Sequence, residues 1–272
     1  PDTFSDYFVQ KIEKLRQELD SQPSAPLSLG KPFSGEPLFS FSPVTEEQVR
    51  EILTKSAPKT CELDPIPTTL LFECVDEVLP TLTKIINKSL ISGSFPDVHK
   101  TALVKPLIKK PSLDHNDLKN FRPVSNLSFV SKLIEKIVLS QLSSHLTNNK
   151  LFNPFQSAYR PGHSTETALV KIVNDQLLAL HKGKLSVLAL LDLSAAFDTV
   201  DHTILLNRLQ FVFGIENTAL HWFTSYLTNR TQTVSINNNT SNPAPVSFGV
   251  PQGSVLGPVL FVLYTVPLSD VF

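Results

Sequence analysis

The residue best placed to do chemistry is Asp192, which lies near the end of an apolar run. Leu185 to Leu193 is nearly continuous in apolar residues and is bounded by Gly183 and Ser194. Such a run predicts a strand that is buried on both faces. Ligands of α/β sheets collect at strand ends, and an ionised carboxylate there is costly unless it binds a cation or several donors. Asp192 therefore indicates either a cation site or an N-cap for a helix that begins at Ser194.

A second segment with chemical potential is a glycine- and proline-containing loop around Gln252. It reads Phe248-Gly249-Val250-Pro251-Gln252-Gly253-Ser254. Two glycines and a proline allow a flat ligand to approach the backbone closely, although turns of this kind are common. Phe197 follows Asp192 by five residues, and two polar segments precede both motifs. These segments are Asn120-Phe121-Arg122-Pro123-Val124-Ser125 and Gln156 to Ser164.

The order of these segments resembles the reverse transcriptase of non-LTR (LINE-type) retrotransposons. The resemblance covers about residue 45 to the C-terminus, and its motifs are Lys105-Pro106-Leu107-Ile108-Lys109-Lys110, Phe121-Arg122-Pro123, Ala158-Tyr159-Arg160-Pro161-Gly162, Asp192 with Phe197, and Gly249 to Ser254. It implies an α+β right-hand polymerase with fingers at 95–184 and a partial palm at 185–272. A helix with a Pro/Ser-rich linker at 1–44 and a helical N-terminal extension at 45–94 would precede them.

The resemblance also implies a role for individual residues. Asp192 matches the first of three catalytic carboxylates, which with the Leu193 carbonyl would bind one of two Mg²⁺ ions. Phe197 matches a steric gate that favours deoxynucleotides, or else it is an ordinary core residue. Gln252 and Gly253 match the segment beside the nascent base pair.

The implied partners are an RNA template, a DNA primer and deoxynucleoside triphosphates. Arg160 and Lys132 would reach phosphates, unless they are simply solvated surface residues. Lys105, Lys109 and Lys110 would contact template phosphates without sequence preference. Arg122 would join them or serve as a structural ion-pair partner.

The sequence departs from the family pattern at the second catalytic motif. No pair of adjacent aspartates follows Gln252, where Asp270 is the last acidic residue. We therefore expect a chain truncated before that motif, inactive by itself and prone to self-association through the incomplete palm. The alternatives are a catalytically dead RNA- or DNA-binding remnant and a decayed retroelement product with no biochemical role. Asp198 and Asp201 could form a carboxylate cluster with Asp192, but we expect them mainly at a turn and a helix start. His202, His163 and His115 are expected at the surface or in caps.

Charge and composition limit the classes of protein that remain. The 272 residues carry a net charge of −1, which excludes a uniformly basic nucleic-acid-coating protein. Six basic and two acidic residues nevertheless lie between Lys100 and Arg122, which indicates an anion-binding segment or a solvated loop. Two cysteines exclude a disulfide scaffold. With no signal peptide and no long apolar span, we expect an intracellular, non-secreted, non-membrane protein of the cytoplasm or nucleus.

Hydrophobic periodicity and turn residues predict the local elements. Thr45-Glu46-Glu47-Gln48 fits a capping box that opens a helix. Residues 68–91 predict a helix pair broken at Pro80 and ended by Gly93. The other expected elements are helices at 4–19, 128–146, 164–181, 203–213 and 259–266, a strand at 102–108, and a hairpin of 231–236 with 244–248.

Overall fold

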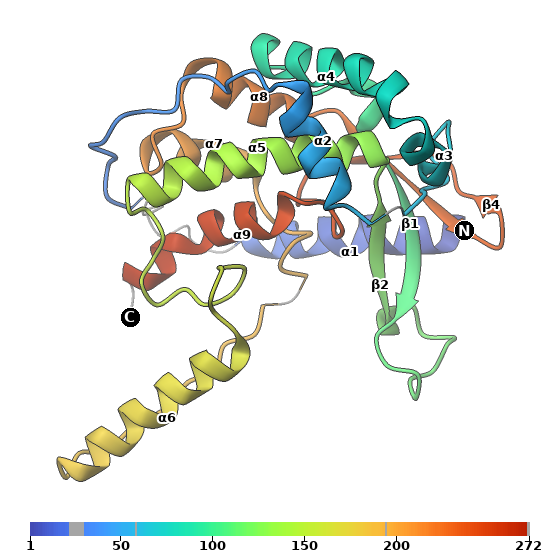
Figure 1. Ribbon diagram of the computed structural model, residues 1–272. Coiled ribbons are helices and arrows are strands. Elements are labelled where there is room, and N and C mark those ends of the chain that lie inside the picture. Colours follow the sequence, from blue (N-terminus) through green and yellow to red (C-terminus); the bar gives the residue numbers. More distant parts are fainter. Residues whose placement is uncertain (22–29, 58, 194, 271–272) are drawn as a thin grey trace.

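A computed structural model describes residues 1–21, 30–57, 59–193 and 195–270. Helices surround a small mixed sheet, and α6 projects from the body on its own (Figure 1). The helices are α1 (Asp2–Asp20), α2 (Glu46–Thr54), α3 (Thr68–Glu73), α4 (Val75–Ser92), α5 (Phe129–Asn148), α6 (Thr165–His181), α7 (His202–Phe211), α8 (Asn217–Leu227) and α9 (Gly257–Thr265). Short 3-10 turns lie at η1 (Asp97–His99), η2 (Leu118–Asn120) and η3 (Val266–Asp270).

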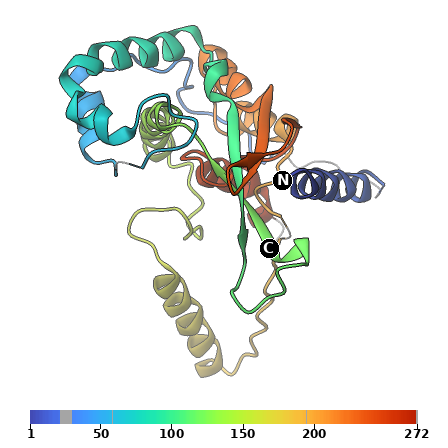
Figure 2. The same ribbon diagram turned by 90° about the vertical axis from the view of Figure 1, so that its right-hand side faces the viewer.

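The sheet combines segments that are far apart in the sequence. Its strands are β1 (Thr101–Ile108), β2 (Phe121–Asn126), β3 (Arg230–Ile236), β4 (Asn239–Thr240) and β5 (Ala244–Val246), in the order β2-β1-β3-β4 with β5 also paired to β3. Strands β1 and β2 form an antiparallel hairpin, with Leu103 opposite Asn126. Strands β1 and β3 are parallel, with Leu103 opposite Thr233. The sheet lies between the α4 and α5 side of the molecule and α1 (Figure 2).

Local sequence signals explain where the helices begin. The capping box at Thr45 is present in full, because its side chain accepts a hydrogen bond from the Gln48 amide and its own amide bonds the Gln48 side chain. Ser128 and Ser164 cap α5 and α6 through their hydroxyl groups. The expected strand at 102–108 and the pairing of 231–236 with 244–248 are confirmed by β1 and by the β3–β5 pair.

The helix pair at 68–91 breaks at a different place from the one expected. Pro80 lies inside α4 without ending it, and the break falls at Cys74, between α3 and α4. A proline removes one backbone hydrogen bond from a helix interior. The burial of Leu79, Leu82 and Ile86 on the same helix offsets that loss. Gly93 ends α4 in the left-handed conformation, as expected.

One hydrophobic core joins most of the helices. Its members run along the chain from Phe41 to Leu263. At its centre the rings of Trp222 and Tyr226 stack with centroids 5.4 Å apart, and Phe95 meets Tyr226 edge-on at 5.2 Å. Both aromatic residues of the stack come from α8, a helix that has no counterpart among the expected elements.

A buried carboxylate ties α5 to two other helices. Glu135 has no exposed surface, and its Oε2 accepts hydrogen bonds from the amides of Val255 and Leu256 at 2.7 and 3.1 Å. The same oxygen accepts from the Tyr226 hydroxyl at 3.2 Å, and Ser131 Oγ donates to Oε1 at 3.1 Å. Burial raises the pKa of Glu135, whereas these backbone bonds and the charge of buried Arg230 lower it. The carboxylate thus satisfies the amides that lead into α9.

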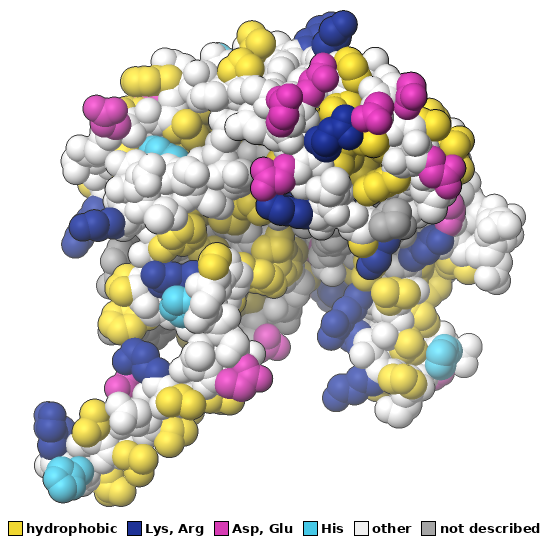
Figure 3. Space-filling model, viewed as in Figure 1, with side chains coloured by type: hydrophobic (Ala, Val, Ile, Leu, Met, Phe, Trp, Pro, Cys, Tyr) yellow, Lys and Arg dark blue, Asp and Glu magenta, His cyan; other side chains and the backbone are white. Residues whose placement is uncertain are grey.

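The apolar run at 185–193 is not the buried strand that its composition predicts. These residues are extended, pair with no strand of the described chain, and lie open to solvent, with Leu185 at 99% and Val187 at 96% exposure. β1 lies between β2 and β3, and the far side of β3 carries β4 and β5. β3 has partner strands on both sides, and β1 has them at Leu103 and Val104, so this central part of the sheet offers no edge to the run. Helix α6, which precedes the run, also has no buried residue (Figure 3).

No helix within the described ranges is both long enough and apolar enough to cross a membrane.

The buried carboxylate gives a direct prediction about stability. Glu135→Ala removes the acceptor of three hydrogen bonds from backbone and Tyr226, together with the negative charge that acts on buried Arg230. We expect a loss of about 3–5 kcal/mol in the free energy of unfolding. Glu135→Gln should lose about 1–3 kcal/mol, and Ser131→Ala about 1 kcal/mol. Denaturant titration followed by the fluorescence of buried Trp222, the single tryptophan, measures all three. A Glu135→Ala protein as stable as Ser131→Ala would contradict this account.

Candidate functional site

The loop between β5 and α9 brings together three segments that are distant in the sequence. The Val250 amide donates to the Phe197 carbonyl and the Gly249 amide to the Val200 carbonyl, both at 2.8 Å. On the other side, the Ser125 amide at the end of β2 donates to the Gln252 carbonyl at 2.8 Å. The motifs around Arg122, Phe197 and Gln252 therefore meet at one place. The resemblance identifies these motifs from their order in the sequence, and the hydrogen bonds show that they are in contact.

Two glycines allow this close approach. Gly249 has φ +85°, and a Cβ built there would lie 2.7 Å from the Asp198 carbonyl oxygen. Gly253 has φ +121°, and its Cβ would lie 2.4 Å from the Ser125 carbonyl oxygen. In both places the obstacle is backbone, which cannot rotate away. Glycine is therefore required for conformation and for space at the two ends of the loop.

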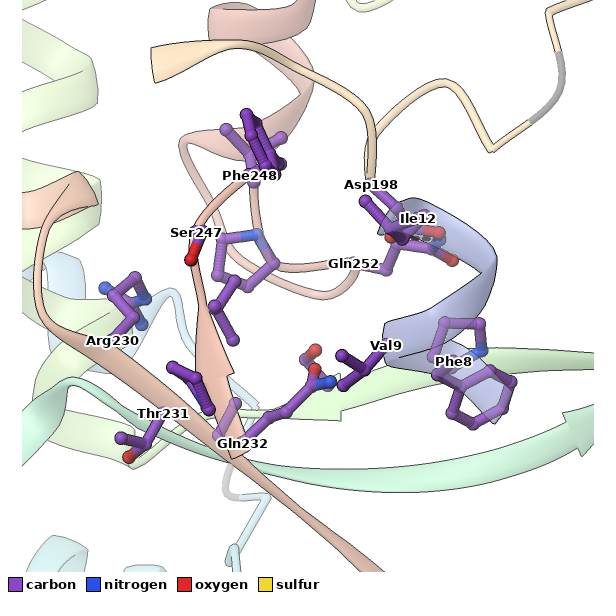
Figure 4. A pocket seen from close by; sticks show the side chains of 18 of the residues that line it. Phe8, Val9, Ile12, Asp198, Arg230, Thr231, Gln232, Ser247, Phe248 and Gln252 are labelled. Carbon is purple, nitrogen blue, oxygen red and sulfur yellow. Dashed lines mark hydrogen bonds between the residues drawn. The ribbon is translucent and has the colours of Figure 1, made fainter. Parts of the chain in front are cut away.

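Asp198 and Gln252 form the polar centre of the site. The Gln252 Nε2 lies 2.8 Å from both carboxylate oxygens of Asp198 and donates to them (Figure 4). Burial raises the pKa of Asp198, while the Gln252 bond and the charge of Lys11 lower it. Asp198 was expected only as a turn residue, and its amide does close a turn on Ala195. Its partnership with Gln252 spans 54 positions and leaves no local signal in the sequence.

The neighbouring residues Asp201 and His202 fix the same loop. Asp201 Oδ1 accepts from the Ile204 amide at 3.0 Å, which confirms its expected place at a helix start. His202 Nε2 donates to the Gly249 carbonyl at 2.7 Å. Burial lowers the pKa of His202. The expectation of a surface or capping role for His202 is therefore wrong, since its half-buried ring binds the backbone of the loop at Gly249.

Phe197 is half-buried and contacts other aromatic rings. Its ring lies 4.9 Å from that of Phe261 on α9 and 6.3 Å, edge-on, from that of Tyr159. The backbone of the same residue carries the bond to Val250. Phe197 thus packs against other aromatic rings, and it also lies beside the loop. This one position is compatible with both the gate and the core interpretations.

Asp192 and Leu193 lie apart from this cluster, in the exposed extended run. The expectation that Asp192 ends a buried strand is wrong, because no strand forms there. The other interpretation placed a helix start at Ser194, which lies outside the described residues, and residues 195–199 form turns. In the described ranges no three His, Cys, Asp or Glu side chains gather as a cation would need. These residues do not fit a Mg²⁺ site.

The two residues expected to reach phosphates have other surroundings. Arg160 Nη1 donates to the Asn153 carbonyl at 3.2 Å and lies close to the Phe152 ring, so it closes its own loop. Lys132 is half-buried on α5 near Cys61, and its charge opposes the rise in thiol pKa that burial causes. Neither residue belongs to the group of side chains around Gln252.

The remaining basic residues lie on the β1–β2 hairpin, which projects from the body. Lys105 pairs with Glu62, and Lys109 Nζ donates to the Lys119 carbonyl at 2.7 Å. Lys110 and Arg122 are exposed. Lys and Arg side chains follow this projection, and the surface between the hairpin and α6 is hollowed (Figure 3). The hairpin therefore offers positive charge along one side of an open face.

A cavity of about 160 Å³ lies beside the Asp198–Gln252 pair. Its walls come from the loop, from β3 and β5, and from α1, which contributes Phe8, Val9 and Ile12 (Figure 4). Polar groups of Gln232, Ser247 and Gln252 lie among these apolar residues. A mixture of apolar walls and a few polar groups is typical of a ligand pocket.

Comparison with known proteins matches the chain to reverse transcriptases. The family model for reverse transcriptase (RNA-dependent DNA polymerase) matches residues 108–271. An RNA-directed DNA polymerase from the mobile element jockey of Drosophila melanogaster is 31% identical over 93% of this chain and 26% of that protein. A probable RNA-directed DNA polymerase from transposon BS of the same species is 28% identical over 97% of the chain and 28% of that protein. A 149 kDa protein of transposon TX1 from Xenopus laevis is 32% identical over 71% of the chain and 14% of that protein. The chain thus spans about a quarter of the length of the first two relatives.

The glycine contacts at the loop can be tested against a matched control. Gly249 and Gly162 both have positive φ, but a Cβ at Gly162 would meet nothing within 4 Å. Gly162→Ala should therefore lower the free energy of unfolding by only about 1 kcal/mol, the conformational cost of a side chain at positive φ. Gly249→Ala should lower the free energy of unfolding by about 1–3 kcal/mol more than Gly162→Ala, because its Cβ meets the backbone of Asp198. Denaturant unfolding compares the two variants, and an equal loss would show that the close approach is absent.

Proposed function

This chain belongs to the reverse transcriptase family, and from that premise we propose that it is the nucleic-acid- and nucleotide-contacting part of a retrotransposon RNA-directed DNA polymerase. The observation that carries the proposal is the meeting of three motifs, those of Arg122, Phe197 and Gln252, around one loop. Fingers at 95–184 and a palm from 185 onward remain our proposed division. The proposed partners are an RNA template, a DNA primer and deoxynucleoside triphosphates.

We assign the nucleotide to the face formed by Phe197, Gln252 and Gly253. Asp198 accepts hydrogen bonds from the Gln252 Nε2, which orients the amide and leaves Oε1 as the group that a ligand can reach. A carbonyl oxygen at that position accepts a hydrogen bond from a base or sugar donor. The Phe197 ring beside the loop limits the space for a sugar substituent. Gly253 keeps the backbone open to a flat base.

We assign the phosphate backbone of the nucleic acid to the projecting hairpin. Lys105, Lys109, Lys110 and Arg122 supply positive charge there, and the face beside them is hollowed (Figure 3). Such contacts strengthen binding without reading sequence. Arg160 and Lys132 are assigned weaker, peripheral contacts, since their local bonds and burial restrict their reach.

The proposed activity of this chain is binding and positioning, and not primer extension by itself. Polymerases of this kind use Mg²⁺ to activate the primer hydroxyl and to bind the triphosphate. The described residues do not fit that ion, because Asp192 and Leu193 are exposed and no three His, Cys, Asp or Glu side chains of the described ranges gather around a cation position. We therefore derive no chemical step for these residues.

The exposed apolar run at 185–193 supports a further proposal, namely self-association. Val187 and Leu190 are both exposed, and the run has strong strand propensity with free backbone groups. We expect Val187→Lys with Leu190→Lys to shift the protein toward monomer in sedimentation velocity. Asn239→Lys with Thr240→Lys adds the same charge on exposed β4 and should have no such effect. A wild-type protein that stays monomeric at all concentrations would contradict the proposal.

The nucleic-acid assignment is tested by charge reversal on the hairpin. Lys109→Glu with Lys110→Glu should weaken binding to an RNA template annealed to a DNA primer. The slope of log affinity against log salt should fall by about one for each phosphate that the variant no longer neutralises. Fluorescence anisotropy over a range of salt concentrations measures both effects. The control is Lys84→Glu with Lys88→Glu, the same change at two positions of α4. Equal weakening by both pairs, or binding that does not respond to salt, would overturn the assignment.

A further inference from the structure

Helix α1 lies across the sheet on the side that faces the candidate site. Phe8 is only 5% exposed and packs against Val104 of β1 and Val234 of β3. Next to it, the Phe4 ring meets Phe121 of β2 edge-on at 4.9 Å. The helix therefore covers the inner strands with a small apolar cluster that is separate from the main core.

The same helix closes the pocket beside Gln252. Val9, Lys11 and Ile12 line the cavity, and Figure 4 shows Ile12 and Val9 next to the Asp198–Gln252 pair. With α1 in this position the cavity measures about 160 Å³. A cavity of about 150 Å³ holds a molecule the size of benzene. Pockets for larger ligands measure about 300–1,000 Å³. With α1 in place, the cavity is therefore smaller than the pockets that hold ligands of nucleotide size.

Polar contacts hold α1 against the site. Arg16 forms an ion pair with Asp201 at 2.8 Å, and the two side chains are only 17% and 15% exposed. The Arg16 guanidinium also lies over the Phe248 ring, 4.7 Å from its centroid. At the other end of the helix, Asp2 Oδ1 accepts from the Asn242 amide at 3.1 Å. Arg16 thus contacts both the start of α7 and the loop that carries Gln252.

We propose that α1 is an internal cover of the Asp198–Gln252 pocket and competes there with the nucleic acid and its paired nucleotide. The inference rests on the proposed function, because the cavity shares Gln252 with the face to which the nucleotide is assigned. In the closed form the Arg16–Asp201 pair and the Phe8 cluster are intact. In the open form α1 leaves the sheet and uncovers the pocket. Apparent affinity is then the intrinsic affinity reduced by the fraction of molecules that are open.

The experiment compares Arg16→Glu with Lys14→Glu in the full chain. Arg16→Glu places a carboxylate beside Asp201, whereas Lys14 is 79% exposed and pairs with Glu18 of its own helix. The two variants have the same net charge, so their general electrostatic effect on nucleic-acid binding is the same. Hydrogen exchange of the α1 amides reports release of the helix. Anisotropy with the primer–template duplex reports affinity.

We expect Arg16→Glu to speed exchange along α1 and to tighten duplex binding by about fivefold or more relative to Lys14→Glu, because the open fraction rises. Faster exchange with unchanged or weaker binding would overturn the proposal, and weaker binding would make α1 a part of the binding site. If Arg16→Glu leaves exchange unchanged, Phe8→Asp opens the helix from its apolar side and the same criteria apply. A duplex that binds none of these proteins rejects the proposed function itself, and with it the ligand assigned to the cover.

Discussion

The fold depends on a carboxylate that has no contact with water. Glu135 lies inside the protein, where an isolated charge is strongly unfavourable, and its oxygens are surrounded by donors from α5, α8 and the segment before α9. Backbone amides at 255 and 256 bind this carboxylate only if the preceding loop follows one path. The hydrogen bonds of Glu135 in the core therefore help to fix the position of Gln252, three residues before the bound amides. In other proteins, replacement of a buried charged group by an apolar residue can be neutral for stability. Here the replacement would remove the hydrogen bonds that hold the amides of residues 255 and 256.

The candidate site follows from that path. Three segments contribute to it, and two of them form no regular element at the point of contact. Ser125 lies at the end of a strand, Phe197 and Asp198 lie in turns, and Gln252 lies in a loop. What holds them is a set of backbone hydrogen bonds together with the Asp198–Gln252 pair. Backbone contacts of this kind tolerate only glycine at their closest points, which accounts for the Gly249 and Gly253 of the motif.

Local features could be predicted from the sequence because their causes are local. The capping box at Thr45 and the stop at Gly93 involve residues within one helical turn. The order of the motifs predicted the family, which the comparisons show. The apolar run at 185–193 could not be placed, because burial of a strand requires a partner edge, and the free edges depend on pairings between strands that are distant in the sequence. The roles of Asp198 and Glu135 depend on contacts over 54 and 120 positions, which no spacing rule encodes.

The parallel pairing of β1 with β3 has a consequence for how the molecule assembles. Thr101 and Thr231 are 130 positions apart, so this pair forms only after most of the chain has been synthesised. Contacts of such long range close slowly, whereas the β1–β2 hairpin can form early. Helix α1 precedes both strands in the sequence but rests on Val104 and Val234 together. Its docking surface therefore does not exist until β3 is in place. Helix α1 is therefore synthesised well before its docking surface forms, and during that interval the sheet face that it covers is open.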